Sequence, residues 1–207
     1  MKYALVIDLD RCSGCDSCVV ACKHENKLDL GMYRCTVPIV GPTGTFPDIE
    51  QYWLPKACNQ CENPGCVEVC PTGASYRDEE TGVVLIDESK CIGCLTCFQG
   101  CPYNVRMLNP ATNTVQKCTL CFQRHTEKDW EPACVHTCCT GARYFGDLDD
   151  ASSSAAKAVA AAGASNCYHV KDANGLNPST VYILHESTAK WQENPTELAR
   201  VHMGLNS

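Results

Sequence analysis

The sequence is poor in the large aromatic side chains around which small domains usually build a core. Phe, Trp and Tyr make up 7% of its 207 residues, whereas 19 residues are cysteine. A chain of this length forms one or two small domains. Because little conventional core material is available to each, we expect groups bound by cysteine to replace part of the core. Their binding should then be coupled to folding.

Three further absences narrow the function. No apolar stretch approaches the roughly 18 residues of a membrane span, and the longest, around residues 155–163, is interrupted by Lys157. The formal net charge of −7 argues against nucleic acid, which favours a basic protein face. The first eight residues contain no hydrophobic export signal. We expect no direct membrane span, and either a cytoplasmic location or export as a folded complex with a signal-bearing partner.

Most of the cysteines fall into four groups of four. The first and third groups have the spacing C-x2-C-x2-C-x3-C, the second C-x2-C-x4-C-x3-C and the fourth C-x2-C-x12-C-x3-C. The first spacing, followed by proline, is the signature of bacterial ferredoxins, in which three cysteines hold one cluster and the fourth reaches a second. The pattern predicts four [4Fe–4S] clusters and a function in electron transfer. The groups are Cys12, Cys15, Cys18, Cys22; Cys58, Cys61, Cys66, Cys70; Cys91, Cys94, Cys97, Cys101; and Cys118, Cys121, Cys134, Cys138.

Disulfides and zinc are the alternative explanations for so many cysteines. A disulfide-rich secreted domain would be expected to have an export signal and an even number of cysteines. Structural zinc uses two separated C-x2-C pairs, which the fourth group alone could mimic. A cubane cluster fits the short loops better, since glycine between the first two cysteines lets the backbone approach closely and adopt positive φ. Gly14 and Gly93 occupy that position.

An internal duplication is visible in the chain. Residues 6–22 align without a gap on residues 85–101, and residues 66–76 align on residues 134–144. Each unit predicts a short strand, a cysteine loop and a short helix, with strands at 5–7 and 83–86. We expect a hairpin formed by 105–108 and 114–116. An alanine-rich helix is expected over 152–162, with Asp149 or Asp150 as its N-cap and Gly163 as its C-cap. Strands are expected at 168–170 and 180–184, and a helical tail beyond Pro195.

The spacing between groups suggests how they pair. Twenty residues separate Cys70 from Cys91, as between the two halves of an eight-iron ferredoxin, so groups two and three form one lobe and groups one and four the other. The alternative joins group one with two and group three with four. The nested pairing predicts four ligand sets: Cys12, Cys15, Cys18, Cys138; Cys58, Cys61, Cys66, Cys101; Cys91, Cys94, Cys97, Cys70; and Cys118, Cys121, Cys134, Cys22.

The predicted fold is therefore α+β, with two ferredoxin-like lobes formed by duplication, each holding two [4Fe–4S] clusters, and a short C-terminal extension. Residues 1–57 and 103–148 form the outer lobe, which carries groups one and four. Residues 58–102 form the inner lobe, which carries groups two and three. Residues 149–207 form the extension with the alanine-rich helix.

Several stretches carry a resemblance to a known family: 10–15 (DRCSGC), 58–66 (CNQCENPGC), 70–74 (CPTGA), 117–121 (KCTLC) and 132–135 (PACV). The chain resembles the iron–sulfur (beta) subunit of the dimethyl sulfoxide reductase family of molybdopterin oxidoreductases. The resemblance implies the nested pairing and a large catalytic partner with a molybdenum or tungsten bis-pterin guanine dinucleotide centre, which faces the first group. A membrane anchor or a soluble electron donor would serve the other end. The subunit would not be an enzyme on its own.

Two features bear on the details of this resemblance. Cys139 stands where the motif normally has proline, and it could compete with Cys138 as a ligand. Cys94 is present where the nitrate reductase branch has tryptophan and a three-iron cluster. The missing membrane helix and residues 44–49 (GTFPDI) look closest to the arsenate reductase, pyrogallol transhydroxylase and catechol dehydroxylase branches. The alternatives to a subunit of a molybdopterin oxidoreductase are a subunit of a hydrogenase or formate-oxidising complex, and a structural iron–sulfur module.

The remaining candidate residues have ordinary structural explanations. Cys35 and Cys167 lack spacing partners and are expected to be buried or inert thiols. No C-x-x-C-H occurs, so covalent haem is not indicated. Arg11, Lys117 and Arg124 flank the groups, where they either raise cluster potentials or are solvated surface charges. Residues 41–44 (GPTG) are expected to form a turn.

Overall fold

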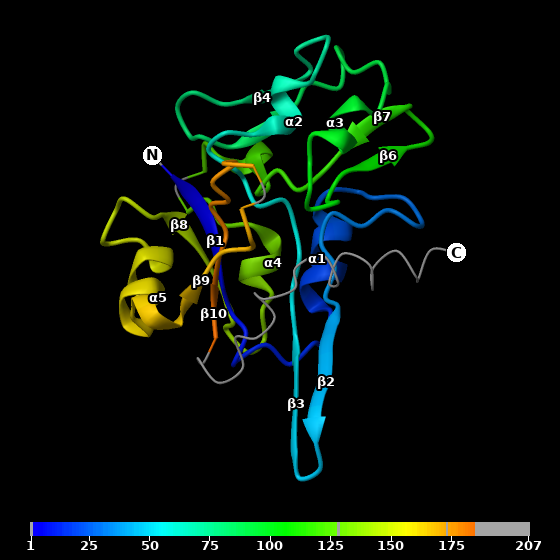
Figure 1. Ribbon diagram of the computed structural model, residues 1–207. Helices are drawn as coiled ribbons and strands as arrows, with labels where there is room; N and C mark the ends of the chain where they lie inside the picture. Colours follow the sequence, from blue (N-terminus) through cyan, green and yellow to red (C-terminus); the bar gives the residue numbers. More distant parts are fainter. Residues whose placement is uncertain (1, 128, 173, 185–207) are drawn as a thin grey trace.

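The computed structural model describes residues 2–127, 129–172 and 174–184. Helices and strands are mixed, and the strands form one four-stranded sheet and three hairpins. One group of short elements gathers at the top of Figure 1, the larger sheet lies in the middle, and a long hairpin extends downward. No helix among the described residues has the length and apolar character that crossing a membrane requires.

The central sheet is built around the first strand, β1 (Tyr3–Asp8). Residues 4–7 of this strand are all buried, as expected for a strand covered on both faces. It pairs antiparallel with β8 (Arg143–Asp147) and parallel with β10 (Val181–Ile183), which pairs in turn with β9 (Cys167–Tyr168). The helix α5 (Ser154–Ala162) packs on the sheet through Ala155, next to Val6 and Val181. Strands β9 and β10 thus complete the sheet that β1 begins.

Four short helices follow the cysteine loops. They are α1 (Ser17–Glu25), α2 (Gly65–Glu68), α3 (Thr96–Gln99) and α4 (Ala133–His136). The aligned loops have matching backbones: the residue before α1 and the residue before α3, Asp16 and Leu95, are both left-handed. A proline in extended conformation precedes both α2 and α4. The repeated sequence therefore folds into repeated local structure. Two single-turn 3-10 helices lie at Phe122–Arg124 and Ala164–Asn166.

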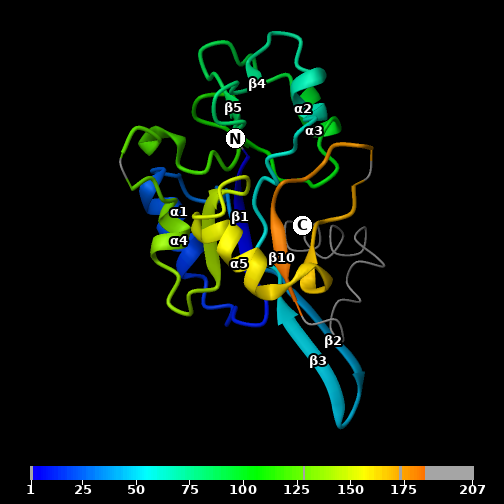
Figure 2. The same cartoon turned by 90° about the vertical axis from the view of Figure 1, so that its left-hand side faces the viewer.

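Two small hairpins flank α2 and α3. One consists of β4 (Ser75–Arg77) and β5 (Val84–Ile86), the other of β6 (Met107–Asn109) and β7 (Thr114–Gln116). Val84 of the first and Val115 of the second share a buried cluster with Cys66 and Cys97. The second hairpin therefore packs with the cysteine groups two and three, although it follows both of them in the sequence. These elements form the top of Figures 1 and 2.

A longer hairpin was not expected from the sequence. It consists of β2 (Ile39–Thr45) and β3 (Asp48–Trp53), and it projects away from the rest of the molecule in both views (Figures 1 and 2). The expectation of a turn at 41–44 is wrong, because these residues lie within β2, where a bulge interrupts the pairing between Val40 and Thr43. A bulge accommodates proline in a strand, since it leaves residues outside the hydrogen-bonded ladder.

The other expected elements are confirmed with small shifts of their ends. Strands occur at both places predicted before the cysteine loops, the hairpin around 110–113 forms, and strands lie near both C-terminal predictions. The start of α5 differs, because its N-cap is Ser153 and not Asp149 or Asp150. Ser153 Oγ accepts a hydrogen bond from the N–H of Ala156 at 3.0 Å, and Gly163 ends the helix as predicted. The predicted helical tail beyond Pro195 lies outside the described residues.

The N-cap gives a test of this local structure. Ser153→Ala removes the oxygen that caps α5, so we expect the free energy of unfolding of the anaerobic holo-protein to fall by about 1 kcal/mol in urea titrations. Asp149→Ala is the matched control, because Asp149 is exposed and its side chain does not cap the helix. Equal losses in the two variants would contradict this assignment of the cap.

Candidate functional site

Cysteines that are far apart in the sequence meet in one cavity. Cys12 and Cys15 come from the loop after β1, Cys18 from the first turn of α1, and Cys138 from the segment after α4. Together they line a cavity that we call site one. The N–H of Ala142 donates to Cys138 Sγ at 3.2 Å. Cys138 rather than the exposed Cys139 therefore lines site one, while Cys139 Sγ lies 3.6 Å from Cys15 Sγ at the surface.

A second cavity, site four, lies beside the first. It is lined by Cys118, Cys121 and Cys134 of the fourth group and by Cys22, which α1 carries one turn beyond Cys18. Helical spacing explains the split, because residues four apart lie one turn apart along the helix and can serve neighbouring cavities. Cys35 also lines this cavity, but its Sγ accepts a hydrogen bond from Arg143 Nη2 at 3.2 Å.

The remaining cysteines gather at the other end of the molecule. Cys91, Cys94 and Cys97 line a third cavity with Cys70, which we call site three. The N–H groups of Ser75 and Val115 donate to Cys70 Sγ and Cys91 Sγ, each at 3.4 Å. Site two consists of the other four cysteines of groups two and three. These four are Cys58, Cys61, Cys66 and Cys101. They lie close enough for their charges to interact: burial, and after it the charges of the other three cysteines, raise the pKa of Cys61 to about 12.

The loops of sites one and three need glycine for a second reason besides backbone conformation. Gly14 and Gly93 have φ of 67° and 68°. A Cβ on Gly14 would lie 2.2 Å from the Trp53 ring of β3, and one on Gly93 would lie 2.5 Å from the carbonyl oxygen of Asn113. The long hairpin therefore covers the loop of site one through Trp53. The short hairpin covers the loop of site three in the corresponding place.

The chemistry of these sites fits a polynuclear iron–sulfur group. In the described part of the chain, no three His, Cys, Asp or Glu side chains are grouped to hold a single metal ion. The thiols of sites one, three and four instead line cavities that are partly open to solvent. Burial also raises the pKa of Cys134 to about 12 and that of Cys22 above its usual range. Thiols so placed become thiolates when cations bind among them.

The four sites follow one another in space. Arg143 lines both site one and site four. The charge of Cys58 in site two acts on Cys118 in site four. Site two is linked to site three through Arg106, which lines site three and lies near Cys66 and Cys58. The spatial order is therefore one, four, two, three, and the distal sites each contain one exposed cysteine, Cys15 and Cys94.

Sites four and two are tied together by buried polar side chains. Gln60 Nε2 donates to the carbonyl of Cys118 at 3.1 Å, and Gln60 Oε1 accepts from the N–H of Val84 at 2.9 Å. Lys117 Nζ donates to the same carbonyl at 2.8 Å and also to the carbonyl of Val84. Both side chains are buried. They fix the fourth group against β5, which precedes the third group.

The charged residues that flank the cysteine groups in the sequence differ in their exposure to solvent. Lys117 is 1% exposed and lies inside. Arg11 is exposed and donates to Tyr144 Oη and the Thr140 carbonyl, and the partly exposed Arg124 pairs with Glu127 at 2.9 Å. Cys35 is buried as expected, and Cys167 is partly buried.

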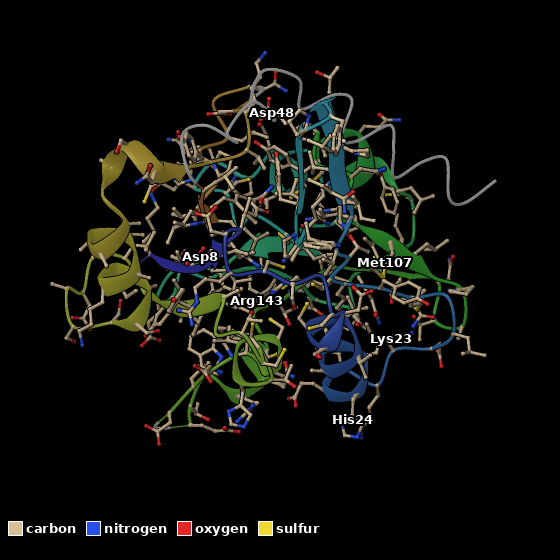
Figure 3. The ribbon with its side chains drawn as sticks, turned by 90° about the horizontal axis from the view of Figure 1, so that it is seen from below. Asp8, Lys23, His24, Asp48, Met107 and Arg143 are labelled. Atoms are coloured by element: carbon tan, nitrogen blue, oxygen red, sulfur yellow. The ribbon has the colours of Figure 1, made fainter. Side chains whose placement is uncertain are left out.

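Sequence reasoning missed four residues at the sites: Arg143, Arg106, Gln60 and Trp53. The repeat could have pointed to Arg143. It follows a Gly-Ala pair, and at the aligned position the first copy has Ser75 after the same pair, so arginine stands where the first copy has a small polar residue. Figure 3 labels Arg143 near the middle of the molecule, whereas His24, at the margin of the same view, is exposed.

Comparison with known proteins finds a matching family and several relatives. Residues 49–148 match the family described as 4Fe-4S dicluster domain. The chain is 41% identical to a sulfite dehydrogenase subunit from Allochromatium vinosum over 219 residues, which cover 97% of this chain and 90% of that protein. It is 41% identical to protein NrfC of Escherichia coli K12, covering 74% and 69% of the two chains.

A third relative is named for its role. The chain is 43% identical to the thiosulfate reductase electron transfer subunit PhsB of Salmonella typhi, over 72% of this chain and 78% of that protein. High identity over most of both chains shows common family membership and not a shared motif alone. The chain belongs to the family of [4Fe–4S] electron-transfer subunits of the molybdopterin oxidoreductases.

Proposed function

We propose that the chain carries electrons through four [4Fe–4S] clusters to or from a large catalytic subunit with a molybdenum or tungsten bis-pterin centre. The clusters would be held by the cysteines of sites one to four, as the nested pairing predicts. Each bound cluster takes up and releases one electron. The protein supplies thiolate ligands, N–H donors to sulfur and a buried environment, which together set the potentials.

The observation that carries this proposal is the order of the sites combined with their exposure. The cysteines of site four are all buried, and so are Cys58, Cys61 and Cys66 of site two. Each distal site has a cysteine at the surface, Cys15 in site one and Cys94 in site three. A relay needs this arrangement, because electrons enter and leave at its ends while the middle is insulated from solvent. We infer that site one faces the catalytic subunit and site three faces a membrane anchor or a soluble electron carrier.

We further propose that the chain is organised as two ferredoxin-like lobes that arose by duplication. The matching backbones around Gly14 and Gly93 and the proline caps of α2 and α4 support it. Groups two and three would form one lobe and groups one and four the other. Val115 of β7, the strand that pairs with β6, packs in one cluster with Val84 and Cys97, which favours a lobe boundary after Gln116 rather than after residue 102. The described part of the extension, residues 149–172 and 174–184, would belong to the lobe of β1, whose sheet its strands join.

The number of clusters can be measured directly. Anaerobically purified protein should contain about sixteen irons per chain, since four cubane clusters with four irons each follow from four ligand sets. Iron and acid-labile sulfide assays, with the chain quantified by amino-acid analysis, check this. Protein that holds about eight irons, with none lost on handling, would contradict four clusters.

The pairing can be tested through the two cysteines that would cross between groups. Cys22→Ser should perturb the cluster of site four and spare that of site one, whereas Cys138→Ser should do the reverse. Oxygen is a poorer ligand than thiolate for a cubane iron, so the affected cluster shifts its potential or loses one iron. Electron paramagnetic resonance spectra of the reduced protein report each cluster.

Cys139→Ser is the matched control for this experiment. It changes the neighbouring cysteine, which is exposed and is not among the residues that line site one. We expect its spectra and iron content to equal those of the wild type. A Cys22→Ser variant that alters the cluster held by Cys12, Cys15 and Cys18 would refute the nested pairing.

The catalytic partner should be found by gentle isolation. A relay without a substrate site must dock close to a catalytic centre, so we expect a stable hetero-oligomer with a specific interface. Affinity purification of the tagged chain under anaerobic conditions should recover a large subunit with molybdenum or tungsten at one metal per complex. A chain that is monomeric in cell extract, with nickel or no further metal in any partner, would argue for a different enzyme or a free ferredoxin.

A further inference from the structure

Two arginines are buried between the sites. Arg143 is 4% exposed and Arg106 is 6% exposed. Arg143 lies where site one and site four adjoin, and Arg106 lies where site three adjoins the cysteines of site two. Removing a guanidinium from water is costly unless negative charge accompanies it. The two arginines therefore require an anionic partner in the interior.

No carboxylate supplies that partner among the described residues. Arg143 Nη2 donates to Cys35 Sγ at 3.2 Å, and Arg106 Nη2 donates to Ser75 Oγ at 2.8 Å. Arg143 Nη1 and both Nε and Nη1 of Arg106 are buried without a hydrogen-bond partner in the described part of the chain. Their charged neighbours are cysteines: Cys35, Cys134 and Cys18 for Arg143, and Cys66, Cys97 and Cys58 for Arg106. Each guanidinium thus stands among cysteines of two sites.

The two arginines come from positions that do not correspond in the repeat. Arg143 begins β8, and its counterpart in the aligned segment is Ser75, which begins β4. The guanidinium of Arg106 reaches Ser75 from the segment before β6. The chain therefore places a cation between the paired sites in both halves of the molecule, but by different residues. A purely structural remnant of the duplication would have used the same position twice.

We propose that Arg143 and Arg106 are internal countercharges of the relay in addition to the buried Lys117, with Arg143 raising the reduction potentials of the clusters at sites one and four, and Arg106 those at sites two and three. This inference rests on the proposed four-cluster function. Reduction adds one electron to a cluster that thiolates already make negative. A cation close by in a poorly solvated interior stabilises the reduced form more than the oxidised form. One guanidinium shared by two clusters also weakens the repulsion between electrons on both.

The experiment compares charge removal with charge retention. Arg143→Gln and Arg106→Gln keep a polar side chain without the charge, and Arg143→Lys and Arg106→Lys keep the charge. Each variant is produced in the complete complex and titrated anaerobically while paramagnetic resonance signals are recorded. Signals are assigned with Cys22→Ser and Cys138→Ser. Lys157→Gln is the control, because Lys157 is an exposed cation on α5 and lines none of the cavities at sites one, three and four.

We expect R143Q to lower the potentials at sites one and four and leave those at sites two and three unchanged. R106Q should do the opposite, while both lysine variants and K157Q stay near the wild type. If R143Q loses iron while R143K keeps it, the requirement for charge is supported. Full iron content in R143Q with unchanged potentials, an equal shift of all four clusters, or loss of iron from both R143Q and R143K would overturn the inference. Wild-type protein with fewer than four clusters would instead refute the proposed function.

Discussion

The structure depends on one electrostatic constraint, which is that crowded, buried thiols cannot all become anionic without cations among them. Burial and the neighbouring cysteines raise the pKa of Cys61 and of Cys134 to about 12. Iron lowers that barrier by binding the thiolates, so cluster uptake and formation of the interior are one process. This explains how a chain with 7% aromatic residues forms a stable interior. It also explains why cysteines share the buried clusters with Leu5, Val84 and Val115.

The local structure of the sites was predictable because cysteine spacing acts over short distances. Three cysteines in a short loop can surround one face of a cubane when the loop turns back and leads into a helix, and in both aligned loops the turn lies at glycine. Cys18 and Cys22 lie one helical turn apart, so α1 contributes to two sites. The cysteines predicted together for sites one, three and four each line a common cavity, and their roles as cluster ligands stay a prediction.

Other features depend on contacts between distant residues, and sequence patterns do not report these. The hairpin of β2 and β3 contains proline and glycine, which in isolation favour a turn, and its extended form depends on pairing with residues 48–53. Trp53 and Gly14 are 39 positions apart and reveal their fit only in three dimensions. The cap of α5 is Ser153 because its Oγ also donates to the carbonyl of Asp147, and so holds the helix against β8. Local propensity alone favoured the preceding aspartates.

The C-terminal strand shows how far the sites depend on the rest of the fold. β10 lies between β1 and β9, and Tyr182 Oη donates to the carbonyl of Pro55 at 3.1 Å. Pro55 and Ile7, the latter on β1, both line site one. The part of the cavity lining that Ile7 and Pro55 form is therefore supported by residues from both ends of the described chain. A strand that carries none of the sixteen grouped cysteines thus helps to position the lining of site one.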